Sequence, residues 1–206
     1  MILLFSGQES NSDNLSMKTM FIDRKKIFSD ILKWDVSIYQ EKYEIDQFDS
    51  DCATYIIVAN DEGKHLASAR LLPTSRDHIL GAIFPNLCDG PVPIGEHIFE
   101  ITRFCLSPSQ SARDRLVSRK RLVTALAEYG LSTGVQTYTG VAERFWYDQI
   151  ASFGWQCSAL GSLSRDSRKG LVALRIDLDE QTIAGLRTGG MYADISWNVP
   201  AERIAA

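Results

Sequence analysis

Residues 97–107 read HIFEITRFCLS, and the alternation of apolar and polar side chains in this stretch predicts a central β-strand. Two ionisable residues, Glu100 and Arg103, lie within it. Because side chains alternate across a strand, the pair points to opposite faces unless a β-bulge intervenes. Most positions of a central strand are apolar, so the charged pair indicates a functional site.

The segments after this strand alternate between helical and extended patterns. Residues 115–133 have helical spacing, with an expected inner stripe of Leu116, Leu122, Val123, Leu126 and Ala127. Strands are expected at 135–141, 155–160 and 171–178, and helices at 142–153 and 180–186.

The segments before the strand predict a short strand, a helix and a hairpin. Residues 2–5 are the short strand, and Ser12 or Asp13 is the expected helix cap. The apolar residues of that helix are Leu15, Met20, Phe21, Ile27, Phe28, Ile31 and Leu32. Residues 52–72 predict the hairpin, which Pro73 ends, and a short helix is expected around 79–84. This order predicts one α/β (α+β) domain over residues 1–206, a sandwich with a mixed sheet between helices.

Composition sets the broad class of the protein. The 206 residues are 45% hydrophobic and 23% charged, as in ordinary globular domains, and the net charge of −4 argues against a general nucleic-acid binder. No apolar run approaches the length of a membrane span, and the N-terminus does not look like a signal peptide. The four cysteines are widely spaced, which favours a reducing cytoplasm over a disulfide framework or a metal centre.

The net charge conceals an asymmetry along the chain. Residues 1–60 carry 6 basic and 10 acidic side chains, whereas residues 101–144 carry 7 and 3. The basic excess lies in Arg113, Arg115, Arg119, Lys120 and Arg121. Such a cluster is either a solvated helix face or a docking patch for an acidic or phosphate-bearing partner.

Familiar catalytic motifs are absent from the sequence. There is no GxxxxGK[ST], no GxGxxG after a strand and no GxSxG. Three scattered histidines make a Ser-His-Asp triad or a histidine metal site unattractive. Carboxylate, arginine and aromatic chemistry remains.

Three further segments concentrate such residues. Arg24 and Phe28 share a helix face and precede Trp34, a combination that suits a ligand with a carboxylate and a flat ring, or else is ordinary core. The carboxylates Glu44, Asp46 and Asp49 repel one another unless cations compensate them.

The third segment supplies such a cation. Arg70 lies in an otherwise small and apolar run and needs a carboxylate partner if it is buried, with Asp46 and Asp49 as candidates. The acidic group is therefore either a solvated acidic loop or a site for a cationic substrate, with internal arginines as partners.

In order and spacing these residues resemble the acyl-homoserine lactone synthases, the autoinducer synthases of bacterial quorum sensing. The resemblance is carried by Arg24-x3-Phe28-x5-Trp34, Glu44-x-Asp46-x-Phe48-Asp49, the run 69–74 (ARLLPT), Phe84 and Glu100-x2-Arg103-Phe104. It covers about the first half of the chain. Thr102 stands where serine is common, and Lys42 where glycine is common.

The resemblance implies a Gcn5-type N-acyltransferase fold, a three-layer sandwich whose central sheet is splayed to admit a phosphopantetheine arm. It implies two substrates: S-adenosylmethionine (SAM) and an acyl thioester on acyl carrier protein or coenzyme A (CoA). Acylation of the SAM amine and lactonisation would release methylthioadenosine. No cofactor or metal is expected.

The family pattern also assigns roles. Glu100 is the expected general base, and Arg24, Phe28 and Trp34 resemble part of the SAM pocket. Glu44, Asp46, Asp49 and Arg70 complete the matched set, and Arg103 either binds the SAM carboxylate or forms a structural ion pair.

The acyl side is matched more loosely. Phe84, Phe104 and Thr139 are placed among the substrate-binding residues, and a threonine near Thr139 is associated in the family with 3-oxo acyl chains. The basic cluster of residues 113–121 is the expected dock for acidic acyl carrier protein, or for CoA phosphates.

Two other functions compete with this interpretation. An acetyl-CoA-dependent N-acetyltransferase would need a Q/R-x-x-G-x-G/A loop, whereas residues 107–120 (SPSQSARDRLVSRK) contain no glycine. A non-catalytic module that binds SAM or an acyl carrier would not need Glu100.

Overall fold

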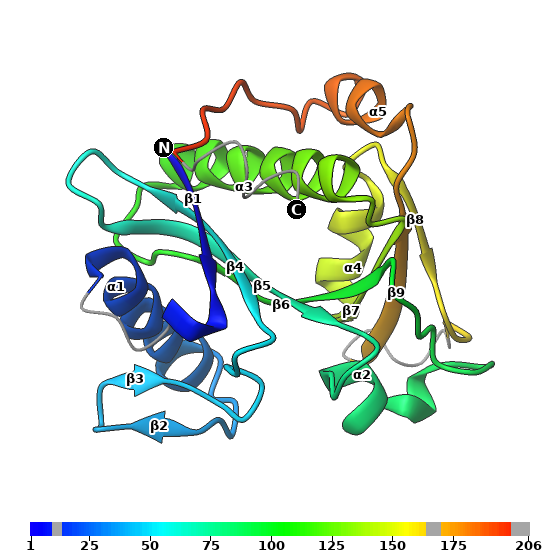
Figure 1. Ribbon diagram of the computed structural model, residues 1–206, viewed down its shortest axis with the longest axis horizontal. Helices are drawn as coiled ribbons and strands as arrows, with labels where there is room; N and C mark the ends of the chain where they lie inside the picture. The colour runs from blue at the N-terminus through cyan, green and yellow to red at the C-terminus, as the bar shows by residue number, and fades with distance from the viewer. Residues whose placement is uncertain (10–13, 164–169, 199–206) are drawn as a thin grey trace.

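The structure is a computed structural model, and it describes residues 1–9, 14–163 and 170–198. A seven-stranded sheet runs through it in the order β1-β4-β5-β6-β7-β9-β8 (Figure 1). The strands are β1 (Ile2–Ser6), β4 (Thr54–Ala59), β5 (His65–Pro73), β6 (Ile98–Leu106), β7 (Thr137–Glu143), β8 (Gln156–Ala159) and β9 (Leu171–Asp177). The helices are α1 (Leu15–Arg24), α2 (Ile79–Ala82), α3 (Ala112–Thr133), α4 (Arg144–Ala151) and α5 (Thr182–Thr188). Short elements are β2 (Ile38–Tyr39), β3 (Tyr43–Glu44) and 3₁₀ turns at Gly7–Glu9 and Pro85–Leu87.

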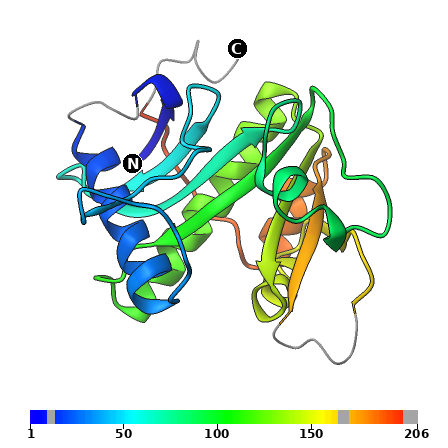
Figure 2. The same ribbon diagram turned by 90° about the horizontal axis from the view of Figure 1, so that it is seen from below.

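The pairing of β6 with β7 divides the sheet. These strands are parallel and pair only from Ile98–Thr137 to Glu100–Thr139, whereas the other neighbouring strands of this sheet are antiparallel. Beyond Glu100 the two strands diverge, and Figure 2 shows the halves of the sheet separating from each other. The predicted mixed, splayed sheet is confirmed.

Helices cover both faces of the sheet (Figure 1). One face packs against α3 and α4 in a core that includes Ile56, Leu71, Leu126 and Tyr138. The opposite face packs against α1 and α2 in a smaller core that includes Met20, Phe21 and Tyr55. Alternation along β4 explains the division, because Tyr55 and Ile57 enter the smaller core while Ile56 and Val58 enter the larger one. The three-layer architecture expected from the sequence is therefore present.

Helix α3 begins three residues earlier than predicted, because the Ser111 hydroxyl accepts a hydrogen bond from the Asp114 amide and caps the helix. It ends at Gly134, whose φ of 76° suits glycine. Its inner stripe holds Leu122, Val123, Leu126 and Ala127, but Leu116 is exposed, so that part of the prediction was wrong.

The N-terminal helix also differs from its prediction. Asn14 caps α1 by accepting from the Ser16 and Met17 amides; Ser12 and Asp13 lie outside the described residues. After Arg24 the backbone continues as a π-helix over Lys25–Ile31. This change of period turns Ile31 and Leu32 outward, although helical spacing placed them on the buried side. Leu15, also expected on that side, is exposed as the first residue of α1.

A β-bulge in β6 brings two charged side chains to the same face. The register with β5 shifts between Ser68 and Arg70, and Arg103 has a φ of 49°, in the left-handed region. Glu100 and Arg103 therefore both lie on the α1 side of the sheet. The sequence placed them on opposite faces unless a β-bulge intervened, and the bulge is present. Within the described residues, no helix is long and apolar enough to span a membrane.

The corrected stripe of α3 predicts different costs for two leucines. Leu122→Ala removes a fully buried side chain and is expected to lower the free energy of unfolding by about 3 kcal/mol. Leu116→Ala, on the same helix but exposed, is expected to change it by less than about 0.5 kcal/mol. Urea denaturation of both variants checks this, and equal losses would contradict the assigned helix faces.

Candidate active site

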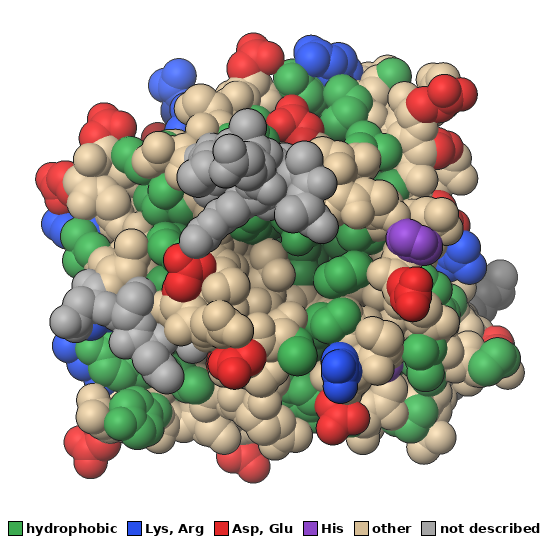
Figure 3. Space-filling view, in the orientation of Figure 1, with side chains coloured by type: hydrophobic (Ala, Val, Ile, Leu, Met, Phe, Trp, Pro, Cys, Tyr) green, Lys and Arg blue, Asp and Glu red, His purple; other side chains and the backbone are tan. Residues whose placement is uncertain are grey.

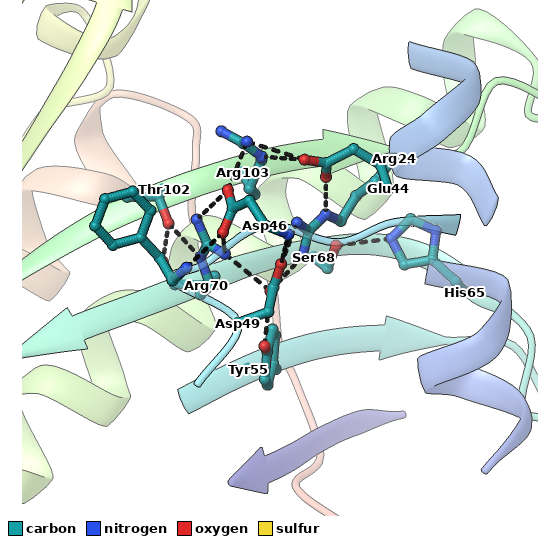
Figure 4. Close-up of polar contacts among 11 residues, drawn as sticks. Arg24, Glu44, Asp46, Asp49, Tyr55, His65, Ser68, Arg70, Thr102 and Arg103 are labelled. Atoms are coloured by element: carbon teal, nitrogen blue, oxygen red, sulfur yellow. Dashed lines mark hydrogen bonds and ion pairs between the residues drawn. The ribbon is translucent and has the colours of Figure 1, made fainter. Parts of the chain in front are cut away.

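Six charged side chains form one buried network on the α1 side of the sheet (Figure 4). Its arginines are Arg24 at the end of α1, Arg70 on β5 and Arg103 on β6; its carboxylates are Glu44, Asp46 and Asp49, from β3 and the loop after it. We call these six residues the charge network. The sequence predicted all six as site residues, and the structure brings them together.

Arg24 anchors the acidic segment to α1. Its Nη1 and Nη2 atoms each donate to one oxygen of Asp49 at 2.8 Å, and its Nε donates to Glu44 at 2.5 Å. The Arg24 side chain is 1% exposed. A bidentate pair fixes orientation as well as distance, so Arg24 sets the path of the loop between Glu44 and Asp49.

Arg70 joins the same loop to the sheet. Its Nη1 lies 2.6 Å from Asp46 and 2.9 Å from Asp49, and its Nε donates to the Thr102 hydroxyl at 2.9 Å. Asp49 also accepts a hydrogen bond from the Tyr55 hydroxyl at 2.7 Å. Each buried charge therefore meets an opposite charge, as burial demands.

The acidic residues also organise their own loop. Asp46 accepts from the Phe48 amide, and Asp49 accepts from the Asp46 amide, both at 2.8 Å. Burial opposes ionisation of Asp49, but Arg24 and Arg70 hold the pKa of its carboxyl well below the usual value. Asp49 and Glu44 in turn hold the pKa of Arg24 above its usual value despite burial.

Arg103 is the arginine of the network with the most exposed side chain, at 13%. Its Nε and Nη2 donate to Glu44 at 3.1 and 2.9 Å, and Nη2 also reaches Asp46 at 2.6 Å. A left-handed backbone is uncommon for arginine and is often kept at functional sites. Arg103 is thus the member best placed to meet a ligand.

Two aromatic residues lie beside Arg103. Phe28 and Trp34 stack with ring centroids 5.1 Å apart and 16° between planes, and the Arg103 guanidinium carbon lies 5.4 Å from the Phe28 centroid. The Trp34 amide donates to the Phe28 carbonyl at 2.8 Å, just after the π-helix. Phe28 is buried and Trp34 is 40% exposed, so one indole face is available to a ligand.

Glu100 lies on the same face, at the point where β6 and β7 begin to diverge. Its side chain caps α2: Oε2 accepts from the Ile79 amide at 2.6 Å, and Oε1 from the Leu80 amide at 2.9 Å. Burial raises the pKa of Glu100 to about 7, although these two amides favour the ionised form. A carboxyl that titrates near neutrality suits proton transfer.

The other three predicted substrate-binding residues are Thr139, Phe84 and Phe104, and they lie in different surroundings. Thr139 is opposite Glu100 in the register of β6 and β7, is fully buried, and its Oγ1 has no partner among the described residues. Phe84 follows α2 and packs against the smaller core. Phe104 packs into the larger core, 5.8 Å from the Trp146 ring of α4.

The basic residues of α3 are not equivalent. The guanidinium of Arg119 lies 5.6 Å from the Trp146 centroid and donates to Gln149 at 3.1 Å, so it bridges α3 and α4. Burial and the nearby Arg115 lower the pKa of Arg119. Arg113 is exposed, and Arg115, Lys120 and Arg121 are partly exposed and bridge no second helix in the described residues, so these four can meet a partner more readily.

Several polar residues near the network were missed. Tyr55 and Thr102 donate to or accept from its members, but nothing in their local sequence separates them from ordinary strand residues.

His65 lies 2.9 Å from both Asp23 and Ser68, so the three side chains are linked in the order Asp-His-Ser, as in a catalytic triad. All three are buried, so this chain of hydrogen bonds ties α1 to β5 and does not face a substrate.

Among the described residues, no group of three or more His, Cys, Asp or Glu side chains is placed to hold a metal ion.

The chain is similar to proteins of known function. Residues 8–186 match the family model described as autoinducer synthase. An acyl-homoserine-lactone synthase from Rhizobium etli is 27% identical over 192 residues, which cover 91% of this chain and 88% of that protein. The solved structure of MesI, a CoA-dependent acyl-homoserine lactone synthase, is 26% identical, with a TM-score of 0.81 over 96% of this chain and 99% of that chain.

Two more distant structures bear on the fold alone. BjaI, a CoA-dependent acyl-homoserine lactone synthase solved with SAM and isopentyl-CoA, is 21% identical, with a TM-score of 0.83 over 100% of this chain and 96% of that chain. An acyl-CoA N-acyltransferase from Pseudomonas aeruginosa is 16% identical, with a TM-score of 0.54 over 85% of this chain and 98% of that chain. The predicted N-acyltransferase fold is confirmed by these likenesses.

The charge network predicts a large loss of stability when one carboxylate is neutralised. Asp49→Asn leaves Arg24 and Arg70 without their shared anion and is expected to cost about 3–5 kcal/mol. Asp51→Asn, an exposed aspartate of the same loop, is the control and should cost less than about 0.5 kcal/mol. Urea denaturation measures both, and a loss below 1 kcal/mol for Asp49→Asn, on the order of a surface pair, would contradict the network's importance.

Proposed function

The chain belongs to the autoinducer synthase family, and we propose that it is an acyl-homoserine-lactone synthase that acylates the amine of SAM and closes the lactone. The observation that carries this proposal is the position of Glu100. It is buried, has a pKa of about 7, and lies where β6 and β7 separate, with Arg103 on the same face.

SAM binds, in this proposal, beside Phe28, Trp34 and Arg103. The exposed face of Trp34 takes the adenine or the sulfonium, since both are attracted to an aromatic ring. The Nη1 atom of Arg103 takes the SAM carboxylate, because the ion pairs with Glu44 and Asp46 use only Nε and Nη2. Arg24 and Arg70 act as positioning residues that hold Glu44, Asp46 and Asp49.

Glu100 then removes a proton from the SAM ammonium, directly or through a water, so that the amine can attack the thioester carbonyl. The oxyanion that forms is stabilised by backbone N–H groups of the diverging part of β6. Lactonisation needs only that the SAM carboxylate is held close to the carbon bearing the sulfonium, which is a good leaving group.

The acyl chain enters between the diverging strands. Figure 3 shows hydrophobic side chains gathered near the centre of the face, over the region where Figure 1 draws β6 and β7 moving apart. Phe104 and Trp146 form part of the wall, and Thr139 offers its unpaired hydroxyl to a polar group of the acyl chain, such as a 3-oxo carbonyl.

The acyl donor docks on the basic end of α3, which follows β6. Arg113, Arg115, Lys120 and Arg121 suit either the acidic surface of acyl carrier protein or the phosphates of CoA, and Arg119 holds Trp146 behind them. MesI is CoA-dependent, which supports a CoA donor, although acyl carrier protein fits the same surface. The four free cysteines support a cytoplasmic location.

The direct experiment is incubation of the purified protein with SAM and a panel of acyl-CoA and acyl-carrier donors, followed by mass spectrometry. We expect an N-acyl-homoserine lactone and an equal amount of methylthioadenosine. Tight SAM binding without lactone from any donor would favour a non-catalytic SAM-binding module. Acetylation of other amines would favour an ordinary N-acetyltransferase.

Glu100→Gln should lower turnover at least about 100-fold, because an amide cannot take a proton. SAM affinity should stay within about threefold, since Phe28, Trp34 and Arg103 are unchanged. Glu96→Gln, an exposed glutamate just before β6, is the control and should keep wild-type turnover. Full activity of Glu100→Gln would remove the base assignment.

The pKa of Glu100 also predicts a pH profile. A base must be ionised, so kcat/KM should fall tenfold per pH unit below about 7 and level off above about 8. The acid limb should be absent from the residual activity of Glu100→Gln. A wild-type limb near pH 4.5, the ordinary glutamate range, would show that burial does not tune this group.

The docking surface predicts a salt-sensitive Michaelis constant for the acyl donor. Arg113→Ala/Lys120→Ala should raise that constant at low salt and flatten its dependence on ionic strength. Lys64→Ala/Arg187→Ala removes the same charge from other exposed sites and serves as the control. If both double variants behave alike, the basic end of α3 is not the dock.

A further inference from the structure

Two residues that adjoin Glu100 carry buried polar atoms without a hydrogen-bond partner among the described residues. Among the described residues, three buried side-chain atoms lack a hydrogen bond: His78 Nε2, Arg119 Nε and Thr139 Oγ1. Thr139 is opposite Glu100 in the sheet register, and His78 directly precedes Ile79, whose amide donates to Glu100. Buried polar atoms are nearly always hydrogen-bonded, so two exceptions on residues that adjoin Glu100 favour the binding of a polar ligand group in this part of the molecule.

The chemistry of the His78 atom follows from the other ring nitrogen. Nδ1 lies 2.9 Å from the Arg76 carbonyl oxygen. A carbonyl can only accept, so Nδ1 carries the hydrogen, and in the neutral ring Nε2 keeps a free lone pair. Nε2 is therefore a hydrogen-bond acceptor and a potential proton acceptor.

The ring is also held in place. His78 is 3% exposed, and it packs so closely on Gly81 that a Cβ there would lie 2.8 Å from Nε2. The Ile79 amide nitrogen is 2.6 Å from Glu100 Oε2. Two covalent bonds, through the His78 carbonyl carbon, join that nitrogen to the His78 Cα. The His78 Cα is thus at most about 5 Å from the carboxylate oxygen.

The next step rests on the proposed function, in which the site acylates the ammonium group of SAM. Conversion of an ammonium group to an amide requires the removal of two protons from nitrogen. The first leaves before the nitrogen attacks the thioester carbon. The second leaves as the C–S bond breaks and its electron pair goes to sulfur. A single carboxylate holds one proton at a time, and each oxygen of Glu100 already accepts a backbone N–H.

We propose that His78 is a second catalytic residue of this site, whose Nε2 takes the second proton from the substrate nitrogen while Glu100 takes the first. One of the two protons then passes to the thiolate and the other to solvent. Ammonium and thioester thereby give amide, thiol and one released proton, so that atoms and charge balance.

Two substitutions separate proton transfer from hydrogen bonding. His78→Asn keeps an N–H group near the Nδ1 position and removes Nε2, whereas His78→Gln puts an amide oxygen near the Nε2 position that accepts a hydrogen bond but holds no proton. We expect both to slow single-turnover amide formation by about 100-fold, the lower end of the range for proton-transfer groups. SAM affinity and melting temperature should be unchanged. His97→Asn, at an exposed histidine, is the control.

Three outcomes would overturn the proposal. A wild-type rate in His78→Asn means that the ring has no role in the reaction. A wild-type rate in His78→Gln with a slow Asn variant means that Nε2 only accepts a hydrogen bond. A lower melting temperature together with weaker SAM binding in both variants means that His78 is structural.

A second measurement does not depend on lactone formation. The measurement is NMR of protein labelled with ¹⁵N-histidine, in which three histidines must be assigned. Saturating SAM should shift the His78 Nε2 resonance and leave that of His97 in place. An unmoved His78 signal with SAM bound would overturn the proposal. If the wild-type protein makes no lactone with any donor, the proposed function fails, and this measurement still decides whether His78 faces the bound amine.

Discussion

The rest of the site depends on the bidentate contact between Arg24 and Asp49. It joins α1 to the acidic loop, and the loop in turn holds Arg70 and Arg103 on two neighbouring strands. Three positive and three negative charges cancel in a space from which water is largely excluded. Such a network contributes little net stability over an apolar core, but it is costly to break, which makes it suited to fixing geometry. The acidic character of the first 60 residues is explained in part by this internal use.

The second constraint is the short pairing of β6 with β7. Three residue pairs hold the two halves of the sheet together, and Glu100 sits on the last of them. In the proposed function, the diverging strands open a route for an extended acyl donor, while the bulge at Arg103 turns a charge toward SAM. One strand would then supply both a base and an anion-binding group, and the two substrates would meet across it.

Much of this arrangement follows from sequence, and the limits have physical causes. The hairpin of β4 and β5 was predictable because two apolar runs flank the turn residues 61–63, and the helix α3 because its apolar spacing matches one buried face. The outward turn of Ile31 and Leu32 was not, because the π-helix changes the period after Arg24 with no local signal. The six members of the charge network were identified individually, and Asp46 and Asp49 were correctly expected as partners of Arg70. The partners of Arg24 and Arg103 depend on a bulge and a loop path that spacing does not reveal. Tyr55, Thr102 and His78 were missed since each is ordinary in its own segment.

The central claim is that the charge network holds Arg103 so that it binds the SAM carboxylate beside Glu100. Isothermal titration calorimetry with SAM and with decarboxylated SAM, on wild-type protein and on Arg103→Gln, tests this claim directly. We expect the wild-type protein to bind SAM at least about tenfold more tightly than the decarboxylated compound, a difference on the order of one charged hydrogen bond. The Arg103→Gln protein should bind the two equally. An Arg103→Gln protein that keeps the wild-type preference for SAM would contradict this claim.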